Sequence, residues 1–342
     1  MLKQVLTILS IFFLGFFMKA QINAFDKGFD AFQRGKYDNA VHFYTIYIED
    51  VQSPNAFFNR GLAYYKLQDF QSAIQDFTKV LRLEPDDYEA LYNRGLANFD
   101  AGKIDSAMSD YKMVLTHNSN YDKALTGLGL CSLHEKDYEN SINYFSEAIV
   151  LNSDSQVNYY NRGLAYHAIQ NYEKAELDYS HAEQLDPSKI DPFISKANMY
   201  HDMGEFGNSV MDYTEAIYLS PETPALYYNR GISYYDNKDF EEAIQDFGEV
   251  LVYDSNQIHA KWYLALSHKE LGNEKEAISF YDQVVSLNPD YEYLWSIDKN
   301  RLQLKKFVEE NWMYTLMLIF LLLASLFFVR KIVKNNRPTE ID

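Results

Sequence analysis

The chain has 342 residues, with 49 acidic and 31 basic side chains and a formal net charge of −18. Nucleic acid is an unfavourable ligand for so acidic a chain, because phosphate contacts need a cationic surface. The single cysteine, Cys131, excludes an intrachain disulfide and a CxxC motif. No HExxH, GxSxG, phosphate-binding glycine loop or zinc-type spacing of cysteine and histidine occurs. We therefore expect no enzymatic activity, no resident metal and no cofactor.

Residues 1–20 are predicted to be a secretory signal peptide. Lys3 precedes an apolar run over residues 5–17, and Ala20 provides the small residue expected at a cleavage site. Lys19 fits the flank of such a site poorly, so an uncleaved N-terminal anchor remains an alternative. No cysteine lies near the site, which excludes a lipoprotein.

Residues 21–291 follow a period of 34 residues. A small residue recurs at this interval at Gly61, Gly95, Gly129, Gly163, Ala197, Gly231 and Ala265. Twelve residues after each stands a second small residue, at Ala73, Ala107, Ser141, Ala175, Ser209, Ala243 and Ala277. Gly28 and Ala40 begin one further unit, offset by 33 residues. Such a period predicts a stacked solenoid, because a single helical hairpin cannot bury its apolar face alone.

Four residues further on, each unit carries an aromatic residue: Tyr44, Phe77, Tyr111, Phe145, Tyr179, Tyr213, Phe247 and Tyr281. A late proline follows in four units, at Pro85, Pro187, Pro221 and Pro289. This pattern resembles the tetratricopeptide repeat. The resemblance implies an all-α, right-handed solenoid of about eight helix-turn-helix repeats. We place their bounds at 21–53, 54–87, 88–121, 122–155, 156–189, 190–223, 224–257 and 258–291.

The repeats depart from the family pattern in two ways. Serine replaces the proline at Ser119, Ser153 and Ser255, and the tyrosine three places after the small residue is replaced by Asn98, Ser132 and His268. The small residues and the aromatic are kept in every unit, so the expected fold is unchanged.

A cation directly before the small residue accompanies an acid sixteen residues later. The pairs are Arg60 with Asp76, Arg94 with Asp110, Arg162 with Asp178, Lys196 with Asp212, and Arg230 with Asp246. Where the first position is Leu128 or Leu264, the second is aromatic, Tyr144 or Phe280. We predict structural salt bridges between the two helices of one repeat, forked where the cation is arginine.

The resemblance also implies that the first helix of each repeat lines a concave groove and that the residue two before the small one points into it. Four repeats carry asparagine at that position, and an aromatic residue precedes it in five. The set is Phe58, Asn59, Tyr92, Asn93, Tyr160, Asn161, Tyr228, Asn229 and Trp262. An asparagine amide donates to and accepts from a peptide backbone, and tyrosine and tryptophan are enriched at interfaces. We predict a partner-binding groove, interrupted at Thr126 and Gly127; the alternative is that these residues only brace neighbouring helices.

Three segments follow the repeats. Residues 292–311 keep helical periodicity and are predicted to cap the solenoid. Residues 312–329 carry no charge and are long enough to cross a bilayer, with a buried C-terminal helix as the alternative. The tail, 330–342, holds four basic residues next to this segment, which predicts a cytoplasmic C-terminus and extracytoplasmic repeats, on the periplasmic side of a bacterial inner membrane.

Charge and architecture together suggest the kind of partner. Without residues 1–20 and 330–342, the chain keeps 25 basic and 47 acidic residues, net −22, which favours neutral or basic protein partners. We expect a membrane-tethered scaffold that binds peptides or proteins in the groove. A sensor that couples extracytoplasmic binding to a separate partner is the alternative. A metal or small-molecule site at His167 and His201, with His134 and Asp202 beside them, is a third hypothesis.

Overall fold

The computed structural model describes residues 24–292 and residue 310, and every element within them is helical. The predicted signal peptide (1–20), the predicted capping segment (292–311) except residues 292 and 310, the predicted membrane segment (312–329) and the basic tail (330–342) lie outside the described residues. Within the described part, no helix is both long and apolar enough to span a bilayer.

Residues 24–33 are helical and are followed by fifteen further α-helices in the described residues. Their bounds are α2 Tyr37–Asp50, α3 Pro54–Lys66, α4 Phe70–Leu83, α5 Tyr88–Asp100, α6 Ile104–His117, α7 Asp122–His134, α8 Tyr138–Leu151, α9 Gln156–Ala168, α10 Tyr172–Leu185, α11 Asp191–Asp202, α12 Phe206–Leu219, α13 Pro224–Asp236, α14 Phe240–Tyr253, α15 Ile258–Glu270 and α16 Glu274–Leu287. A short 3₁₀ turn, Pro289–Tyr291, follows.

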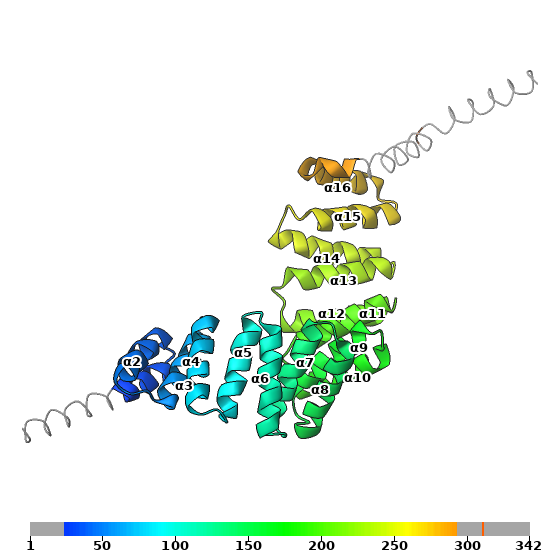
Figure 1. The fold of residues 1–342 in the computed structure, drawn as a ribbon. Coiled ribbons are helices and arrows are strands. Elements are labelled where there is room, and N and C mark those ends of the chain that lie inside the picture. The colour runs from blue at the N-terminus through cyan, green and yellow to red at the C-terminus, as the bar shows by residue number, and fades with distance from the viewer. Residues whose placement is uncertain (1–23, 293–309, 311–342) are drawn as a thin grey trace, which may run out of the picture. The chain divides into compact units, whose positions relative to one another are not determined.

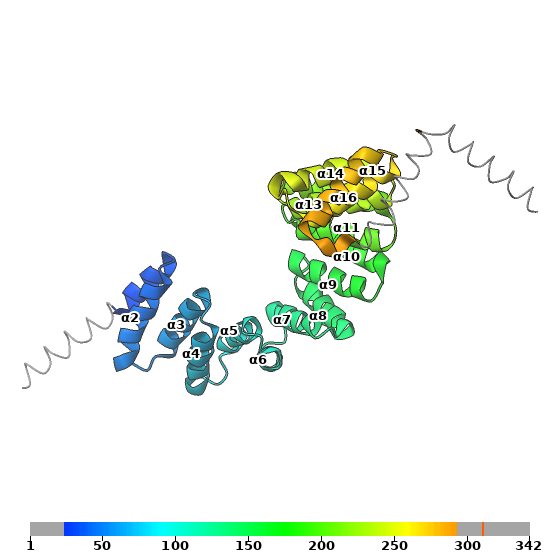
Figure 2. The same ribbon diagram turned by 90° about the horizontal axis from the view of Figure 1, so that it is seen from above.

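The helices pair into hairpins, one for each predicted repeat (Figure 1). We call the first helix of a hairpin helix A (α3, α5, α7 and so on) and the second helix B (α4, α6, α8 and so on). The chain divides into two compact units, 1–199 and 200–342, with the division inside α11. Within each unit the hairpins stack on their neighbours, as expected for an all-α solenoid (Figures 1 and 2).

Helix A lies on the inner side of each unit. Consecutive A helices contact one another directly, as α3 does with α5, α5 with α7, α7 with α9, and α13 with α15. Consecutive B helices make no comparable contact in the described residues. The stack is therefore tighter along the A helices, and their free side chains form the inner face.

The turn inside each hairpin needs a residue in the left-handed region. Glycine fills this place in four repeats, at Gly35, Gly102, Gly204 and Gly272, with φ between 71° and 77°. The other four repeats use non-glycine residues at the equivalent place, Gln68, Lys136, Gln170 and Lys238, with φ between 59° and 69°. The turn geometry is thus common to all repeats although only half of them carry glycine, the residue that adopts it without steric cost.

The period of small and aromatic residues arises from one contact inside each hairpin. A Cβ added to Gly95 would lie 2.7 Å from Cε1 of Tyr111, and one added to Gly61 would lie 3.0 Å from Cε1 of Phe77. The aromatic side chains of helix B are almost fully buried in all eight repeats. In the six repeats with glycine at this place, the ring therefore lies directly on the small residue of its own helix A, and its size limits how closely the two helices approach.

Cys131 takes the place of a small packing residue on α7. Its side chain is fully buried, and burial raises the pKa of the thiol to about 12. Since the thiolate is the nucleophile, this thiol is unreactive at neutral pH.

We expect Gly95→Val to lower the free energy of unfolding by about 1–3 kcal/mol, because a branched side chain would overlap the buried Tyr111 ring. Gly248→Val is the matched control, since no atom lies within 4 Å of a Cβ at Gly248. Urea unfolding of the full-length chain, followed by far-UV circular dichroism, measures both. Equal midpoints for the two variants would show that the ring contact does not constrain the hairpin.

Candidate functional site

The predicted groove residues lie on the A helices α3, α5, α9, α13 and α15, on the inner side of the two units. We call them the aromatic-asparagine stripe: Phe58, Asn59, Tyr92, Asn93, Tyr160, Asn161, Tyr228, Asn229 and Trp262. All nine are half-buried. Each presents part of its side chain to solvent and part to the packed interior.

Each aromatic residue of the stripe packs against the buried ring of helix B in its own repeat. The ring centroids are 5.6 Å apart for Phe58 and Phe77, 6.0 Å for Tyr92 and Tyr111, 6.2 Å for Tyr160 and Tyr179, 5.9 Å for Tyr228 and Phe247, and 5.3 Å for Trp262 and Tyr281. The bracing role considered from the sequence is therefore real. It uses only part of each ring, because the residues remain half-exposed.

Asn93 and Asn161 each use part of their hydrogen-bonding capacity on the backbone of their own helix. Nδ2 of Asn93 donates to the carbonyl oxygen of Glu89 at 2.8 Å, and Nδ2 of Asn161 donates to that of Val157 at 2.7 Å. An asparagine amide offers two N–H donors and one carbonyl acceptor. One donor and the acceptor of Asn93 and of Asn161 thus have no partner among the described residues.

The interruption of the stripe in the fourth repeat has a packing cause. A Cβ on Gly127 would lie 2.6 Å from the ring of Tyr111, which belongs to the preceding repeat. The hydroxyl of Thr126 lies 2.7 Å from Oδ1 of Asn158 and 3.1 Å from the backbone carbonyl oxygen of Asp122, and either oxygen can accept its single proton. Both positions are occupied by contacts inside the array, so they add nothing to a binding surface.

The arginines before the small residues form a second series, directed between the B helices. Nε and Nη2 of Arg60 donate to the two carboxylate oxygens of Asp76, both at 2.8 Å. The shortest N···O distances of the pairs Arg94 with Asp110, Arg162 with Asp178 and Arg230 with Asp246 are 2.6, 2.7 and 2.7 Å. The structure therefore places four of the five predicted pairs at bidentate distance within one repeat.

Each of these arginines also reaches the preceding repeat. Nη1 donates to a hydroxyl on the previous helix B: Arg60 to Thr45, Arg94 to Thr78, Arg162 to Ser146 and Arg230 to Thr214, at 2.9, 3.4, 3.0 and 3.1 Å. We call each set of arginine, aspartate and hydroxyl an arginine clamp. One guanidinium thus joins three helices from two repeats.

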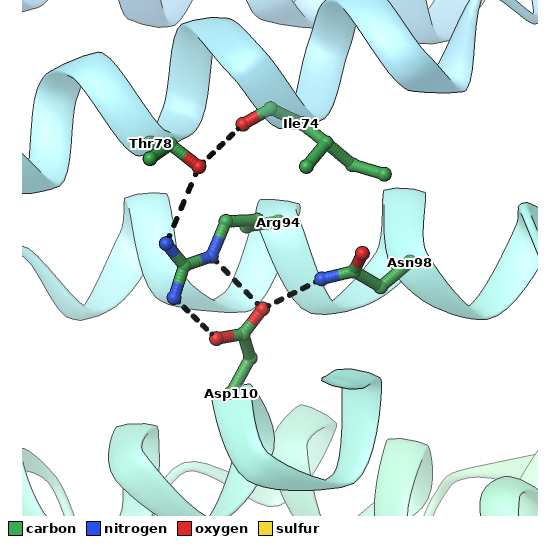
Figure 3. A network of polar contacts seen from close by, with 5 residues as sticks. All are labelled: Ile74, Thr78, Arg94, Asn98 and Asp110. Atoms are coloured by element: carbon green, nitrogen blue, oxygen red, sulfur yellow. Dashed lines mark hydrogen bonds and ion pairs between the residues drawn. The ribbon is translucent and has the colours of Figure 1, made fainter. Parts of the chain in front are cut away.

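Figure 3 shows the clamp of Arg94. Asp110 accepts from Arg94 and also from Nδ2 of Asn98, at 2.9 Å, while the hydroxyl of Thr78 donates to the carbonyl of Ile74 at 2.7 Å. A polar cleft of about 520 Å³ opens here between α4 and α6, lined also by Lys103 and several hydroxyls. Asn98 stands where four of the eight repeats carry tyrosine, and its amide completes the hydrogen bonds of the carboxylate.

The arginine and aspartate side chains of the clamps are largely buried, which indicates a structural role. The aspartate side chains are 4–7 % exposed and the arginine side chains 16–23 % exposed. The hydrogen bond to Asp76 raises the pKa of Arg60, while burial raises the pKa of Asp76 against the opposing effect of the guanidinium. Since each guanidinium is already paired and hydrogen-bonded, the arginines offer no free cationic patch to an external ligand.

The fifth predicted pair spans the two units. Nζ of Lys196 donates to Glu183 at 2.8 Å within the first unit. Asp212 lies in the second unit, and its pairing with Lys196 stays a prediction.

The histidines of the third hypothesis have local partners. His167 lies 3.4 Å from the hydroxyl of Tyr179, His201 lies 2.9 Å from Asp236, and His134 lies 3.3 Å from Glu135. Within the described residues no group of three or more His, Cys, Asp or Glu side chains is arranged to hold a metal ion. No observation therefore supports a metal site in this part of the chain.

Comparisons with known proteins agree with this architecture. Sequence patterns described as "Tetratricopeptide repeat" match residues 25–78, 58–123, 158–189, 224–257 and 259–291, and one described as "TPR repeat" matches residues 197–238. A tetratricopeptide repeat protein from Parabacteroides merdae has a similar structure, with a TM-score of 0.56 and 20% sequence identity over 73% of this chain and 99% of that one. That similarity concerns the fold alone.

Curated relatives match over a short segment. Sperm-associated antigen 1 of Homo sapiens is 45% identical over 65 residues, and that of Rattus norvegicus is 41% identical over 64 residues. These segments are 19% of this chain and 7% of each relative. Since the similarity spans so little of those proteins, their roles do not transfer to this chain.

We expect Arg162→Leu alone to lower the free energy of unfolding by about 3–5 kcal/mol, because it leaves the carboxylate of Asp178 buried and unpaired. The double variant Arg162→Leu, Asp178→Tyr copies the pair Leu128 and Tyr144 of the fourth repeat and should recover most of that loss. Urea unfolding measures both variants. A double variant no more stable than the single one would contradict the assignment of the clamp as a replaceable structural pair.

Proposed function

Because the chain belongs to the tetratricopeptide repeat family, we propose that it is a non-enzymatic interaction scaffold that binds peptide or protein partners on the inner face of its A helices. The family acts through protein-protein interaction. The observation that carries the proposal for this chain is the half-exposed stripe, where Asn93 and Asn161 each keep a donor and an acceptor beside an aromatic ring.

The chemistry of the stripe suits an extended peptide. An amide that donates and accepts pairs with a peptide backbone whatever the side chains are, and a tyrosine ring adds apolar contact area. Affinity from the stripe would therefore depend little on sequence. The arginine clamps play no part in it, because their guanidiniums are bound to buried aspartates.

The proposed partner is a neutral or basic protein or peptide. Residues 24–292 keep an excess of acidic over basic side chains, which repels nucleic acid and other polyanions. The described residues also carry no grouping of side chains that suggests a metal cofactor.

The proposal includes attachment to a membrane. The support is the uncharged run over 312–329, the basic residues that follow it and the signal-like segment 1–20. The repeats would lie on the extracytoplasmic side, at the periplasmic face of a bacterial inner membrane, and the tail 330–342 in the cytoplasm. A scaffold held in this way gathers its partners at the membrane surface.

The triple variant Asn161→Ala, Asn229→Ala, Tyr228→Ala should fold normally and lose its partners, because it removes two amides and one ring from the stripe. We expect partner recovery after crosslinking in intact cells and purification of the full-length chain to fall at least about tenfold, the effect of roughly 1.4 kcal/mol of binding free energy.

The matched control is Gln75→Ala, Gln245→Ala, Tyr218→Ala, which removes the same groups from exposed positions on B helices. Its partner recovery should equal that of the unmodified chain. Equal recovery with the stripe variant would exclude the inner face as the binding surface.

Single cysteines can test the membrane topology, since Cys131 is fully buried and its raised pKa keeps the thiol unreactive. A membrane-impermeant maleimide applied to spheroplasts should label Glu241→Cys, in the repeats, and should label Asn336→Cys, in the tail, only after lysis. The unmodified chain is the background control. Labelling of Asn336→Cys before lysis would refute the proposed orientation.

A further inference from the structure

The second unit carries an aromatic cluster on its inner face. The ring of Tyr263, on α15, lies almost flat against Phe247, with centroids 5.0 Å apart and an interplanar angle of 17°. Tyr228 and Tyr235, both on α13, stand nearly perpendicular to Tyr263, at 6.1 Å and 80° and at 5.5 Å and 74°. We call Tyr228, Tyr235 and Tyr263 the aromatic corner.

The corner is only partly closed by the packing around it. Tyr228 is 5.9 Å from Phe247 and 6.1 Å from Tyr263, so it stands beside the stacked pair and not on top of it. Phe247 is fully buried and covers one face of Tyr263. The three tyrosines are all half-buried, and Tyr235 also packs against Phe240 at 5.4 Å, so only part of each side chain remains open to solvent.

Two carboxylates border the corner. Asp236 follows Tyr235 directly, and Glu270 ends α15; both side chains are exposed. Burial raises the pKa of Tyr235, and the charges of Glu270 and Asp236 raise it further. Burial and the charge of Asp236 act in the same way on Tyr263. Both carboxylates therefore act electrostatically on Tyr235, and Asp236 also acts on Tyr263.

Glu270 differs in its partner from the carboxylate at the equivalent position of the first unit, Asp100. Tyr65, in the second repeat, is at the position equivalent to Tyr235, and its hydroxyl donates to Asp100 of the next repeat at 2.5 Å. Asp236 is bound to His201 at 2.9 Å, whereas Glu270 has no hydrogen-bond or ion-pair partner within the described residues. Glu270, at the end of the helix that carries Tyr263, is thus an acceptor without a partner in the described residues.

The net charge of the second unit also favours a cationic ligand. Residues 200–292 hold 18 acidic and 5 basic side chains, net −13, whereas the longer stretch 24–199 holds 26 and 16, net −10. The second unit therefore has the higher density of negative charge, and it attracts cationic groups more strongly.

We infer that the aromatic corner, with Glu270 and Asp236 at its border, binds the positively charged side chain of a lysine or arginine in a partner protein. A cation gains energy over the face of a tyrosine ring, and a nearby carboxylate adds a charge-assisted hydrogen bond. An uncharged side chain of equal length gains neither. The inference rests on the proposed function, and it implies that the second unit selects partners by charge.

The test uses the full-length chain in detergent and pools of fluorescein-labelled nonapeptides. The central residue is lysine, arginine or norleucine, and the other eight positions vary over uncharged amino acids. Fluorescence anisotropy gives the apparent Kd of each pool. We expect the lysine and arginine pools to bind at least about tenfold more tightly than the norleucine pool, the effect of roughly 1.4 kcal/mol.

Three variants locate the effect. Glu270→Gln and Tyr263→Leu should each reduce the preference for a central cation to less than about threefold, a loss of at least roughly 0.7 kcal/mol of discrimination. Glu241→Gln makes the same change in net charge at an exposed position on helix B and should leave the preference intact. Circular dichroism checks that each variant is folded, and Glu270→Gln keeps the test valid if Tyr263→Leu is not.

The possible outcomes distinguish failure of this inference from failure of the proposed function. A preference that survives both Glu270→Gln and Tyr263→Leu would come from the general acidic field and would overturn the inference. Binding without any preference, lost in the stripe variant of Asn161, Asn229 and Tyr228, would overturn the inference and keep the proposed function. Failure of every pool to bind would overturn both.

Discussion

The whole array depends on the packing contact between the buried aromatic ring of helix B and the small residue of helix A in the same hairpin. At Gly95 there is no room for even a methyl group without moving the Tyr111 ring. The ring is buried, so it cannot turn aside into solvent. In the repeats with glycine at this place, the contact limits how closely the two helices of a hairpin approach, and neighbouring hairpins of similar build can then stack in a regular way.

The arginine clamps add connections between repeats, and they are distributed unevenly. Repeats with Arg60, Arg94, Arg162 and Arg230 are tied to the preceding helix B through a hydroxyl. Leu128 and Leu264 form no such tie. Since the stability of a solenoid is roughly a sum of repeats and nearest-neighbour interfaces, these interfaces must be held by apolar packing, as where the Tyr111 ring covers Gly127 of the next repeat.

The hairpins and the arginine-aspartate pairs could be predicted because one sequence holds eight copies of the same contact. The hydroxyl partners were missed, although the spacing carries them: Thr45, Thr78, Ser146 and Thr214 precede an arginine by 15 or 16 residues. Lys112 and Gly248 stand there before the two leucines. Other features could not be read from spacing. The bond from Asn161 to its own helix depends on a side-chain rotamer. The place of Tyr263 in the aromatic corner depends on the orientation of three other rings.

The two units therefore present different chemistry on the inner face, and this difference bears on how a single scaffold can be both general and selective. The amides of the first unit suit a peptide backbone, which every partner has. The second unit replaces an asparagine by Tyr263 and leaves Glu270 without a partner in the described residues, and residues 200–292 carry negative charge at a higher density than residues 24–199. Backbone contacts alone would hold any extended chain, and a charge-dependent contact alone would hold it weakly, since an exposed cation-π contact contributes only about 0.5–1 kcal/mol. Under the proposed function, the second unit also keeps Asn229 of the stripe, so a cationic partner gains there from both kinds of contact and a neutral competitor from only one.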